Sequence, residues 1–251
     1  MLSVLVFSAA IVLPWLLGGT VEPESSTVDV GQGKQRSLLL LIHDTDNTLT
    51  AAVAVHTDTR TLSVKAVGYP SHTEVSYQVG LSTLARRYAE EGVAAGQYLS
   101  AATGEAYDAV LRLSVSAVAA FVAGSGNGIS YRLPEEVGIL PQGEQTLTSL
   151  QIADVLRYNA WMQSLTGRAE AHAGIIAAII NRHLTPHREL SELFNRFAIL
   201  CDDHVTISQF AAVRDELTAL AAANNGAICR ACVPEGRAVG YGEDRRFVII
   251  A

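Results

Sequence analysis

Three consecutive strand-like segments near the start of the chain constrain its fold more than any other feature. The segment SLLLLIHD, from Ser37 to Asp44, is a continuous apolar run bounded by polar residues, which is typical of a buried strand. Residues 51–56 and 61–67 follow as two further strand-like segments, and the DTR sequence between them is expected to form a turn. A strand that is apolar throughout needs cover on both faces, so we expect helices on both sides of a sheet.

Helical periodicity dominates the remainder of the chain. The segments expected to be helical are 83–102, 113–123, 147–162, 166–184, 189–200 and 208–223, and the later segments expected to be strands are 129–133 and 247–250. In the first of these helices the candidate inward residues are Leu84, Tyr88, Val93 and Tyr98. This order of elements predicts an α/β fold, a layered α/β/α sandwich with a mixed β-sheet, in one domain over residues 37–251.

The N-terminal segment, residues 1–20, is apolar, and the first charged residue of the chain is Glu22. A membrane span needs about 20 apolar residues, so we expect a single-pass membrane anchor here. A cleaved signal peptide and a buried helix of the domain are the alternatives, although the basic start of a signal peptide is absent. Residues 21–36 are rich in Gly, Ser and acidic residues, and we expect them to form a linker.

The charge of the chain excludes one class of partner. The net charge is −7, and the sequence has no run rich in lysine and arginine. Because nucleic-acid binding needs a basic surface, no nucleic-acid partner is expected.

The three cysteines give little evidence for a metal or redox site. Cys229 and Cys232 form a C-x-x-C motif, and Cys201 stands apart from it. A zinc site would need a second pair of ligands, and none lies at a suitable spacing. We expect the motif to lie in a turn, either as a structural disulfide or as free thiols.

Two motifs in the second half of the chain carry a family resemblance. PQGEQTLTSLQIADVLRYN starts at Pro141, and LTGRAEAHAGIIAAI starts at Leu165. Together they resemble the second half of a LytR–CpsA–Psr domain, whose usual pattern is G-x-Q-x-L-x-G-x-x-A-L-x-Y-x-R-x-R followed by D-x-G-R-x-x-R-Q. The positions that match are Gly143, Gln145, Leu147, Arg157, Gly167 and Arg168. In the last motif Leu165, Ala171 and His172 replace the acid, the second arginine and the glutamine.

The first half of the domain resembles the family more loosely. Pro70 and Thr73 match the ends of the family's P-R-D-T motif, but Ser71 and His72 stand in place of its arginine and aspartate. Ala51 falls where the family's A-D-T motif has its aspartate. The resemblance covers roughly residues 37–250, and two expected carboxylates are missing from it.

The resemblance implies a function at the bacterial cell envelope. The family transfers polyprenyl-pyrophosphate-linked glycopolymers onto the cell wall, with peptidoglycan as the acceptor. It implies a domain outside the cell membrane, Mg²⁺ or Mn²⁺ as the cofactor, and an apolar tunnel for the polyprenyl tail. Segments 113–122 and 175–180 are the candidates for lining such a tunnel.

Planar guanidinium groups suit pyrophosphate because they bind two phosphate oxygens at once. The pyrophosphate-binding candidates are Arg157, Arg168, His172 and Arg87. Arg168 and His172 stand four residues apart on an expected helix and therefore share a face. A purely structural role, such as a salt-bridged or solvated helix position, is the alternative for each candidate.

Asp44 and Asp46 are the only acids near the expected metal site, and they either bind a cation or form a capped turn. Ser71 and His72 are not expected to form a catalytic pair, because neighbours on an extended chain point to opposite sides. No catalytic residue is assigned.

The sequence leaves three functional hypotheses. In the first, the protein binds a polyprenyl-pyrophosphate-linked precursor but its catalysis is impaired by the missing motif residues. In the second, it is an active phosphotransferase that moves a lipid-linked glycopolymer onto peptidoglycan. In the third, it is a structural or interaction domain that binds no such ligand. Whether it is an enzyme stays open.

Overall fold

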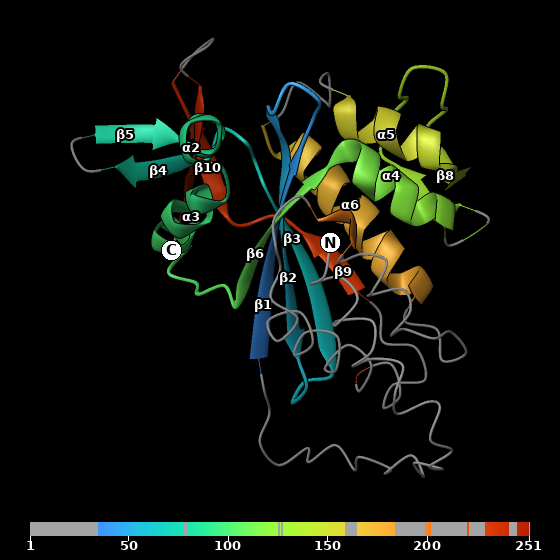
Figure 1. The fold of residues 1–251 in the computed structure, drawn as a ribbon, viewed down its shortest axis with the longest axis horizontal. Helices are drawn as coiled ribbons and strands as arrows, with labels where there is room; N and C mark the ends of the chain where they lie inside the picture. Colours follow the sequence, from blue (N-terminus) through green and yellow to red (C-terminus); the bar gives the residue numbers. More distant parts are fainter. Residues whose placement is uncertain are drawn as a thin grey trace, which may run out of the picture.

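The computed structural model describes residues 35–77, 80–124, 126, 128–158, 165–183, 199–201, 220, 229–240 and 245–250. A five-stranded sheet forms the centre of this part of the chain (Figure 1). In spatial order its strands are β6 (Ala109–Ser114), β1 (Gln35–His43), β2 (Leu49–Asp58), β3 (Ser63–Tyr69) and β9 (Cys229–Cys232).

The sheet is mixed, as the sequence predicts. β2 runs antiparallel to both of its neighbours, β1 and β3, whereas β6 and β9 run parallel to the strands beside them. The carboxyl ends of β6, β1, β3 and β9 therefore lie at one edge, which we call the carboxyl edge.

Helices cover both faces of the sheet (Figure 1). One face packs against α2 (Leu84–Glu91) and α3 (Ala95–Thr103), with the 3₁₀ turn η1 (Gly92–Ala94) between them. The other face packs against α4 (Val115–Gly124), α5 (Ser149–Arg157) and α6 (Leu165–His183). The predicted α/β/α layering is thus present in the described residues.

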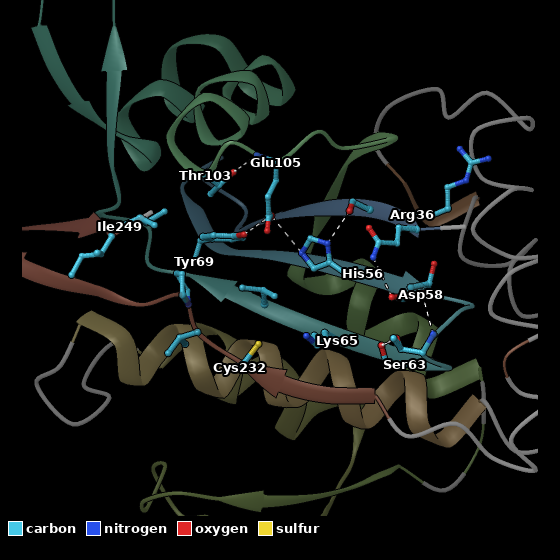
Figure 2. A pocket seen from close by; sticks show the side chains of 18 residues that line it. Arg36, His56, Asp58, Ser63, Lys65, Tyr69, Thr103, Glu105, Cys232 and Ile249 are labelled. Atoms are coloured by element: carbon cyan, nitrogen blue, oxygen red, sulfur yellow. Dashed lines mark hydrogen bonds and ion pairs between the residues drawn. The ribbon is translucent and has the colours of Figure 1, made fainter. Parts of the chain in front are cut away.

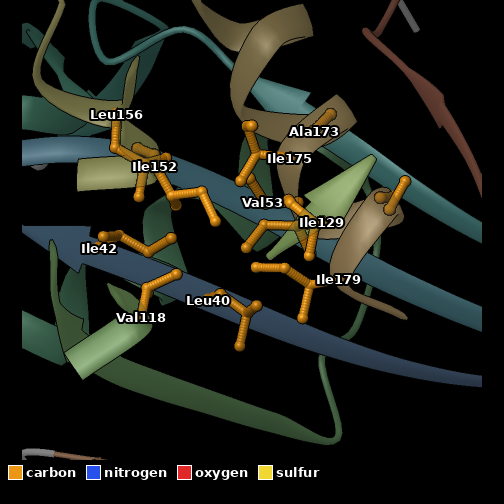
Figure 3. Packing of buried hydrophobic residues seen from close by; sticks show 14 of the residues in the cluster. Leu40, Ile42, Val53, Val118, Ile129, Ile152, Leu156, Ala173, Ile175 and Ile179 are labelled. Atoms are coloured by element: carbon orange, nitrogen blue, oxygen red, sulfur yellow. The ribbon is translucent and has the colours of Figure 1, made fainter. Parts of the chain in front are cut away.

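The two faces of β1 explain why its sequence is apolar throughout. Leu39 and Leu41 belong to the core cluster under α2 and α3. Leu40 and Ile42 point to the opposite side, where Figure 3 shows them in one cluster with Ile175 of α6. The helical segments that we expect to line a tunnel contribute buried residues to this second cluster, and the tunnel itself stays a prediction.

α6 lies very close to the sheet because β3 has a glycine under it. A Cβ built on Gly68 would lie 2.0 Å from the carbonyl oxygen of Ala169, in the first turns of α6. The approach fixes the amino end of α6 against the carboxyl end of β3. α5 is fixed at its own start by a capping box, in which Thr148 and Gln151 each accept from the other's backbone N–H.

Three small antiparallel pairs complete the described structure. They are β4 (Glu74–Tyr77) with β5 (Gly80–Thr83), β7 (Ile129–Leu133) with β8 (Gly143–Leu147), and β10 (Gly236–Val239) with β11 (Arg246–Ile249). Of these strands, the sequence predicted only β7 and β11.

Several predicted boundaries are wrong. The single helix expected at 83–102 breaks at Gly92, whose φ of 60° ends α2, and Val93 and Tyr98 are only part-buried. The helix expected at 113–123 begins two residues later, because Leu113 still belongs to β6. The helix expected from Leu147 begins at Ser149, because Leu147 ends β8.

The C-x-x-C motif forms strand β9 and not the predicted turn. β1 also begins at Gln35, inside the segment expected to be linker. The anchor segment 1–20, the rest of the linker up to residue 34, and nearly all of the helices expected at 189–200 and 208–223 lie outside the described residues. Within the described part of the chain, no helix is both long enough and apolar enough to cross a membrane.

Candidate anion-binding site

Four segments that are distant in sequence meet at the carboxyl edge of the sheet. They are the turn after β1, the turn after β3, the carboxyl end of α5 and the amino end of α6. Ligands of open α/β sheets commonly bind at this edge. All but one of the predicted site residues lie on these four segments, and the exception is Arg87.

Asp44 and Arg157 are partners in the structure, although 113 residues separate them. The Nε of Arg157 donates to both carboxylate oxygens of Asp44, at 3.0 and 3.1 Å. Both side chains are partly exposed, at 38% for Arg157 and 30% for Asp44. A predicted pyrophosphate ligand and a predicted metal ligand therefore neutralise each other.

The turn after β1 has the capped form that the sequence offered as an alternative to a cation site. Asp44 accepts from the backbone N–H of Thr45, and Asp46 accepts from that of Thr48. The hydrogen bonds from Thr48 lower the pKa of Asp46. Asn47 closes the turn with a positive φ of 62°. Across the described residues, no group of three or more His, Cys, Asp or Glu side chains is placed to bind a metal ion.

Arg168 has the most unusual environment of the candidates. It lies in the first turn of α6, which carries no acidic residue. Its Nε is buried and finds no hydrogen-bond acceptor among the described residues. Burial lowers the pKa of Arg168, yet a guanidinium keeps its proton in proteins. A part-buried positive charge therefore lies at a helix amino end, which itself favours anions.

The turn after β3 lies beside Arg168. The charge of Arg168 acts on His72, whose pKa is lowered mainly by burial and further by this cation. Ser71 Oγ and His72 Nδ1 are 3.1 Å apart, so the expectation that these neighbours point apart is wrong. They form a turn, and the argument from extended geometry does not apply to it. His72 nevertheless faces a cation here, so this pair lacks the acid of a catalytic triad.

His172 is a core residue. It is 2% exposed, and its Nε2 lies 3.1 Å from the carbonyl oxygen of Leu156, one of the last carbonyls of α5. Burial, followed by the charge of Arg168, lowers the pKa of His172 to about 3. The ring is therefore neutral near pH 7 and donates to Leu156, so it ties α6 to the end of α5. Its predicted role in pyrophosphate binding stays untested.

Arg87 lies away from the carboxyl edge, on α2, and its environment is not the solvated one expected for this helix. Its side chain is only 6% exposed and forms ion pairs with Glu90 and Glu91 on the same helix. Its Nε also donates to Ser82 Oγ at 3.2 Å, in the neighbouring strand β5. Its neighbour Arg86 is 73% exposed. Arg87 is thus neutralised within its own segment.

The three cysteines are free thiols. Cys229 is buried, and burial raises the pKa of its thiol to about 12, whereas Cys232 is exposed. Side chains three apart on a strand point to opposite faces, which keeps the two thiols from forming a bond across β9.

Sequence reasoning missed a second group of polar residues. Ser37, His56, Lys65 and Glu105 line a hollow of about 550 Å³ on the face of the sheet that α3 covers only in part (Figure 2). The sequence held an indication of it, because the apolar positions of β1 on this face, Leu39 and Leu41, give way to Ser37.

The fold and the carboxyl edge together define a class of protein: a mixed-sheet α/β domain whose carboxyl edge holds a part-buried arginine with no acidic partner among the described residues. No family model and no curated protein matches the sequence. Solved structures do match it, at low identity and over most of their length.

A protein from Eubacterium siraeum described as a transcription regulator matches with a TM-score of 0.72 and 17% identity, over 85% of this chain and 86% of that one. TagT bound to LIIa-WTA matches with a TM-score of 0.68 and 16% identity, over 88% and 87%. A LytR–Csp2A–Psr enzyme from Actinomyces oris matches with a TM-score of 0.65 and 15% identity, over 80% and 81%. The chain therefore has the LytR–CpsA–Psr fold, and the prediction of a divergent domain of this type is confirmed at the level of the fold.

Proposed function

We propose that the protein binds a polyprenyl-pyrophosphate-linked glycopolymer precursor of the cell wall at the carboxyl edge of its sheet, outside the cell membrane. The observation that carries this proposal is the environment of Arg168. The buried Nε of Arg168 has lost its hydration and has no acceptor among the described residues, so an anion from outside these residues is the natural complement.

The pyrophosphate fits this position for two reasons. Its oxygens accept hydrogen bonds from the Nε and the terminal nitrogens of a guanidinium at once. The amino end of α6 adds backbone N–H groups and the positive end of the helix dipole. TagT, which shares this fold, was solved with a ligand named LIIa-WTA, which supports a glycopolymer ligand here.

We infer that turnover is impaired. Asp44, the acid nearest the expected metal position, already neutralises Arg157. Ser71 and His72 replace an arginine and an acid of the resembled motif. Each charged group lost from a transferring phosphoryl group is worth about 10² to 10³ in rate. A divalent ion would therefore need ligands from the precursor's own phosphates, so Mg²⁺ and Mn²⁺ belong in the test.

The binding test uses the full chain in detergent and geranylgeranyl pyrophosphate as the probe. We expect Arg168→Met to weaken binding about tenfold or more, because a hydrogen bond to a charged group contributes about 1.5–3 kcal/mol. Arg86→Met is the matched control, because Arg86 is 73% exposed on α2. This variant should bind the probe as the unchanged protein does. Geranylgeraniol, which has the tail without the charge, should not distinguish Arg168→Met from the unchanged protein.

Phosphate release is measured in the same samples, with and without Mg²⁺ or Mn²⁺. Binding without release supports the proposal. Metal-dependent release would instead favour the active phosphotransferase, with peptidoglycan as the acceptor. If the unchanged protein does not bind the probe, or if Arg168→Met binds it equally well, the carboxyl edge is not a pyrophosphate site and a structural or interaction role remains.

A further inference from the structure

The open end of the α2/α3 face of the sheet is polar, in contrast to the rest of that face. On β1 the inward position before Leu39 is Ser37, and on β2 the position after Ala54 is His56. Lys65 on β3 continues the row. The hollow of about 550 Å³ over these residues is of the size that binds small ligands (Figure 2).

Ser37, His56 and Glu105 form a chain of contacts in this hollow. Ser37 Oγ lies 2.8 Å from Nδ1 of His56, its direct partner across the β1–β2 ladder. His56 Nε2 lies 3.6 Å from Glu105 Oε2, and Figure 2 shows the ring between Glu105 and β1. The three side chains come from two strands and from the loop after α3.

The surroundings determine which ring nitrogen carries the proton. A lone pair on Nε2 would face the carboxylate of Glu105, so the stable tautomer has its proton on Nε2. Nδ1 then accepts the hydrogen bond from the Ser37 hydroxyl. This is the polarity of a serine–histidine–acid triad with the two ring nitrogens exchanged.

The 3.6 Å contact is too long for a hydrogen bond of the neutral ring but short enough for an ion pair. Glu105 therefore stabilises the imidazolium more than the imidazole, which is the differential effect that a catalytic acid must have. His56 Nε2 is buried and has no hydrogen-bond partner among the described residues. Burial lowers the pKa of His56, with a smaller contribution from Lys65, and the ring is neutral and ready to accept a proton near pH 7.

The positions of Ser37 and Glu105 are themselves fixed. Asp108 accepts from the backbone N–H of Ser37 at 2.8 Å, and its own N–H donates to the Ser37 carbonyl at 2.8 Å. Tyr69 donates to Glu105 Oε2 at 3.0 Å. Such fixed geometry lowers the cost of reaching a reactive arrangement.

We propose that Ser37, His56 and Glu105 form a second site, independent of the carboxyl edge, that hydrolyses small carboxylic esters through an acyl-serine. Ser37 Oγ bonds to the ester carbonyl carbon while its proton passes to His56 Nδ1. The carbon–alkoxy bond then breaks, and the alcohol leaves with that proton. Water attacks the acyl carbon and gives a proton to His56. The bond between the acyl carbon and Ser37 Oγ then breaks, the acid leaves, and His56 returns that proton to Ser37 Oγ.

The chain contains a natural control for this chemistry. Ser71 and His72 also lie within hydrogen-bond distance, at 3.1 Å, but their ring faces Arg168 in place of a carboxylate. A cation beside the ring opposes protonation, so Ser71 should be unreactive. The two pairs differ in that a carboxylate, Glu105, acts on His56 against the effect of Lys65, whereas the charge that acts on His72 is that of Arg168.

The test treats the full chain with a fluorescent fluorophosphonate, which phosphonylates activated serines and releases fluoride, and maps the adduct by mass spectrometry. Hydrolysis of p-nitrophenyl acetate is followed in parallel. We expect the adduct on Ser37, its loss in Ser37→Ala, and unchanged labelling in Ser71→Ala. His56→Gln should lower both rates at least tenfold.

Glu105 acts through His56, so its test includes the pH profile. The groups facing His56 are Ser37, Glu105 and Lys65, and of these only Glu105 raises the pKa of the ring. Glu105→Gln should therefore slow labelling and move its inflection to lower pH. No adduct on the unchanged protein, an adduct on another residue, or a Glu105→Gln profile that keeps its inflection would each overturn the proposal.

Discussion

His172 gives a prediction of stability against pH that can be worked out from one side chain. The histidine is fully inside the domain and its pKa falls from 6.5 to about 3 on folding, first through burial and then through Arg168. Between these two pKa values, His172 is therefore protonated in the unfolded chain and neutral in the folded chain. The contribution of His172 to stability is complete above pH 6.5 and is lost as the pH falls from 6.5 toward 3.

The magnitude follows from the width of that window. Each pH unit below 6.5 removes about 1.4 kcal/mol of stability, so at about pH 5 the loss from this group is about 2 kcal/mol. The choice of pH 5 makes the result insensitive to the exact folded pKa, because the folded ring is still neutral there. This is a large share of the 5–15 kcal/mol that stabilises a typical domain.

The assay compares the unchanged protein with His172→Gln by urea unfolding at pH 7.5 and pH 5. The glutamine amide can donate to the Leu156 carbonyl as the ring does, but it does not titrate. We expect the unchanged protein to lose about 2 kcal/mol more than the variant between the two pH values. Other histidines cancel in this difference. Parallel losses in the two proteins would refute the claim that His172 is buried and neutral.

Two further predictions concern the positions that build the carboxyl edge. Gly68→Ala should destabilise the domain by about 1–3 kcal/mol, because its Cβ would lie 2.0 Å from the Ala169 carbonyl oxygen. Gly80→Ala, whose Cβ would meet no atom within 4 Å, is the control, and thermal unfolding is the measurement. Equal stabilities of the two variants would contradict the close approach of α6. A double-mutant cycle on Asp44→Ala and Arg157→Ala should give a coupling free energy of about 0.2–1 kcal/mol. This coupling should fall with added salt, because both side chains are partly exposed. A coupling that salt leaves unchanged would contradict the assignment of a partly exposed ion pair.

The sequence predicted the strands and helices whose apolar pattern fills the core. β1 to β3 and α6 were found because each has one unbroken periodicity. β6 was missed because its apolar residues continue directly into α4. The boundary was marked only by Ser114, whose hydroxyl accepts from the Ala117 N–H at 3.0 Å and caps the helix. The break at Gly92 was missed for a similar reason, since a single glycine is tolerated within a helical pattern.

The candidate site was predicted residue by residue but not as an arrangement. Local sequence cannot show that Asp44 lies against Arg157. It also cannot show that Arg87 is neutralised by acids of its own helix and donates a hydrogen bond to a hydroxyl of β5. The resemblance named Arg168, but only the structure separates it from the other two arginines by its lack of an acidic partner among the described residues. The polar hollow was missed because its members come from three strands and a loop, and only the register of the sheet brings them together.

The charges at the carboxyl edge determine which residues would bind an anion there. Arg157 is available only if Asp44 gives it up, and that pair is partly exposed, so releasing it costs at most about 1 kcal/mol. Among the described residues Arg168 has no such partner, and its partial burial would strengthen a contact with a negative charge. If the proposed function holds, a pyrophosphate would gain most of its binding energy from Arg168 and the amino end of α6, and Arg157 would add to it only as Asp44 moves away. The same argument gives a reason for binding without transfer, as proposed here: anion binding needs the cation and the helix end, whereas transfer also needs carboxylates to hold a metal.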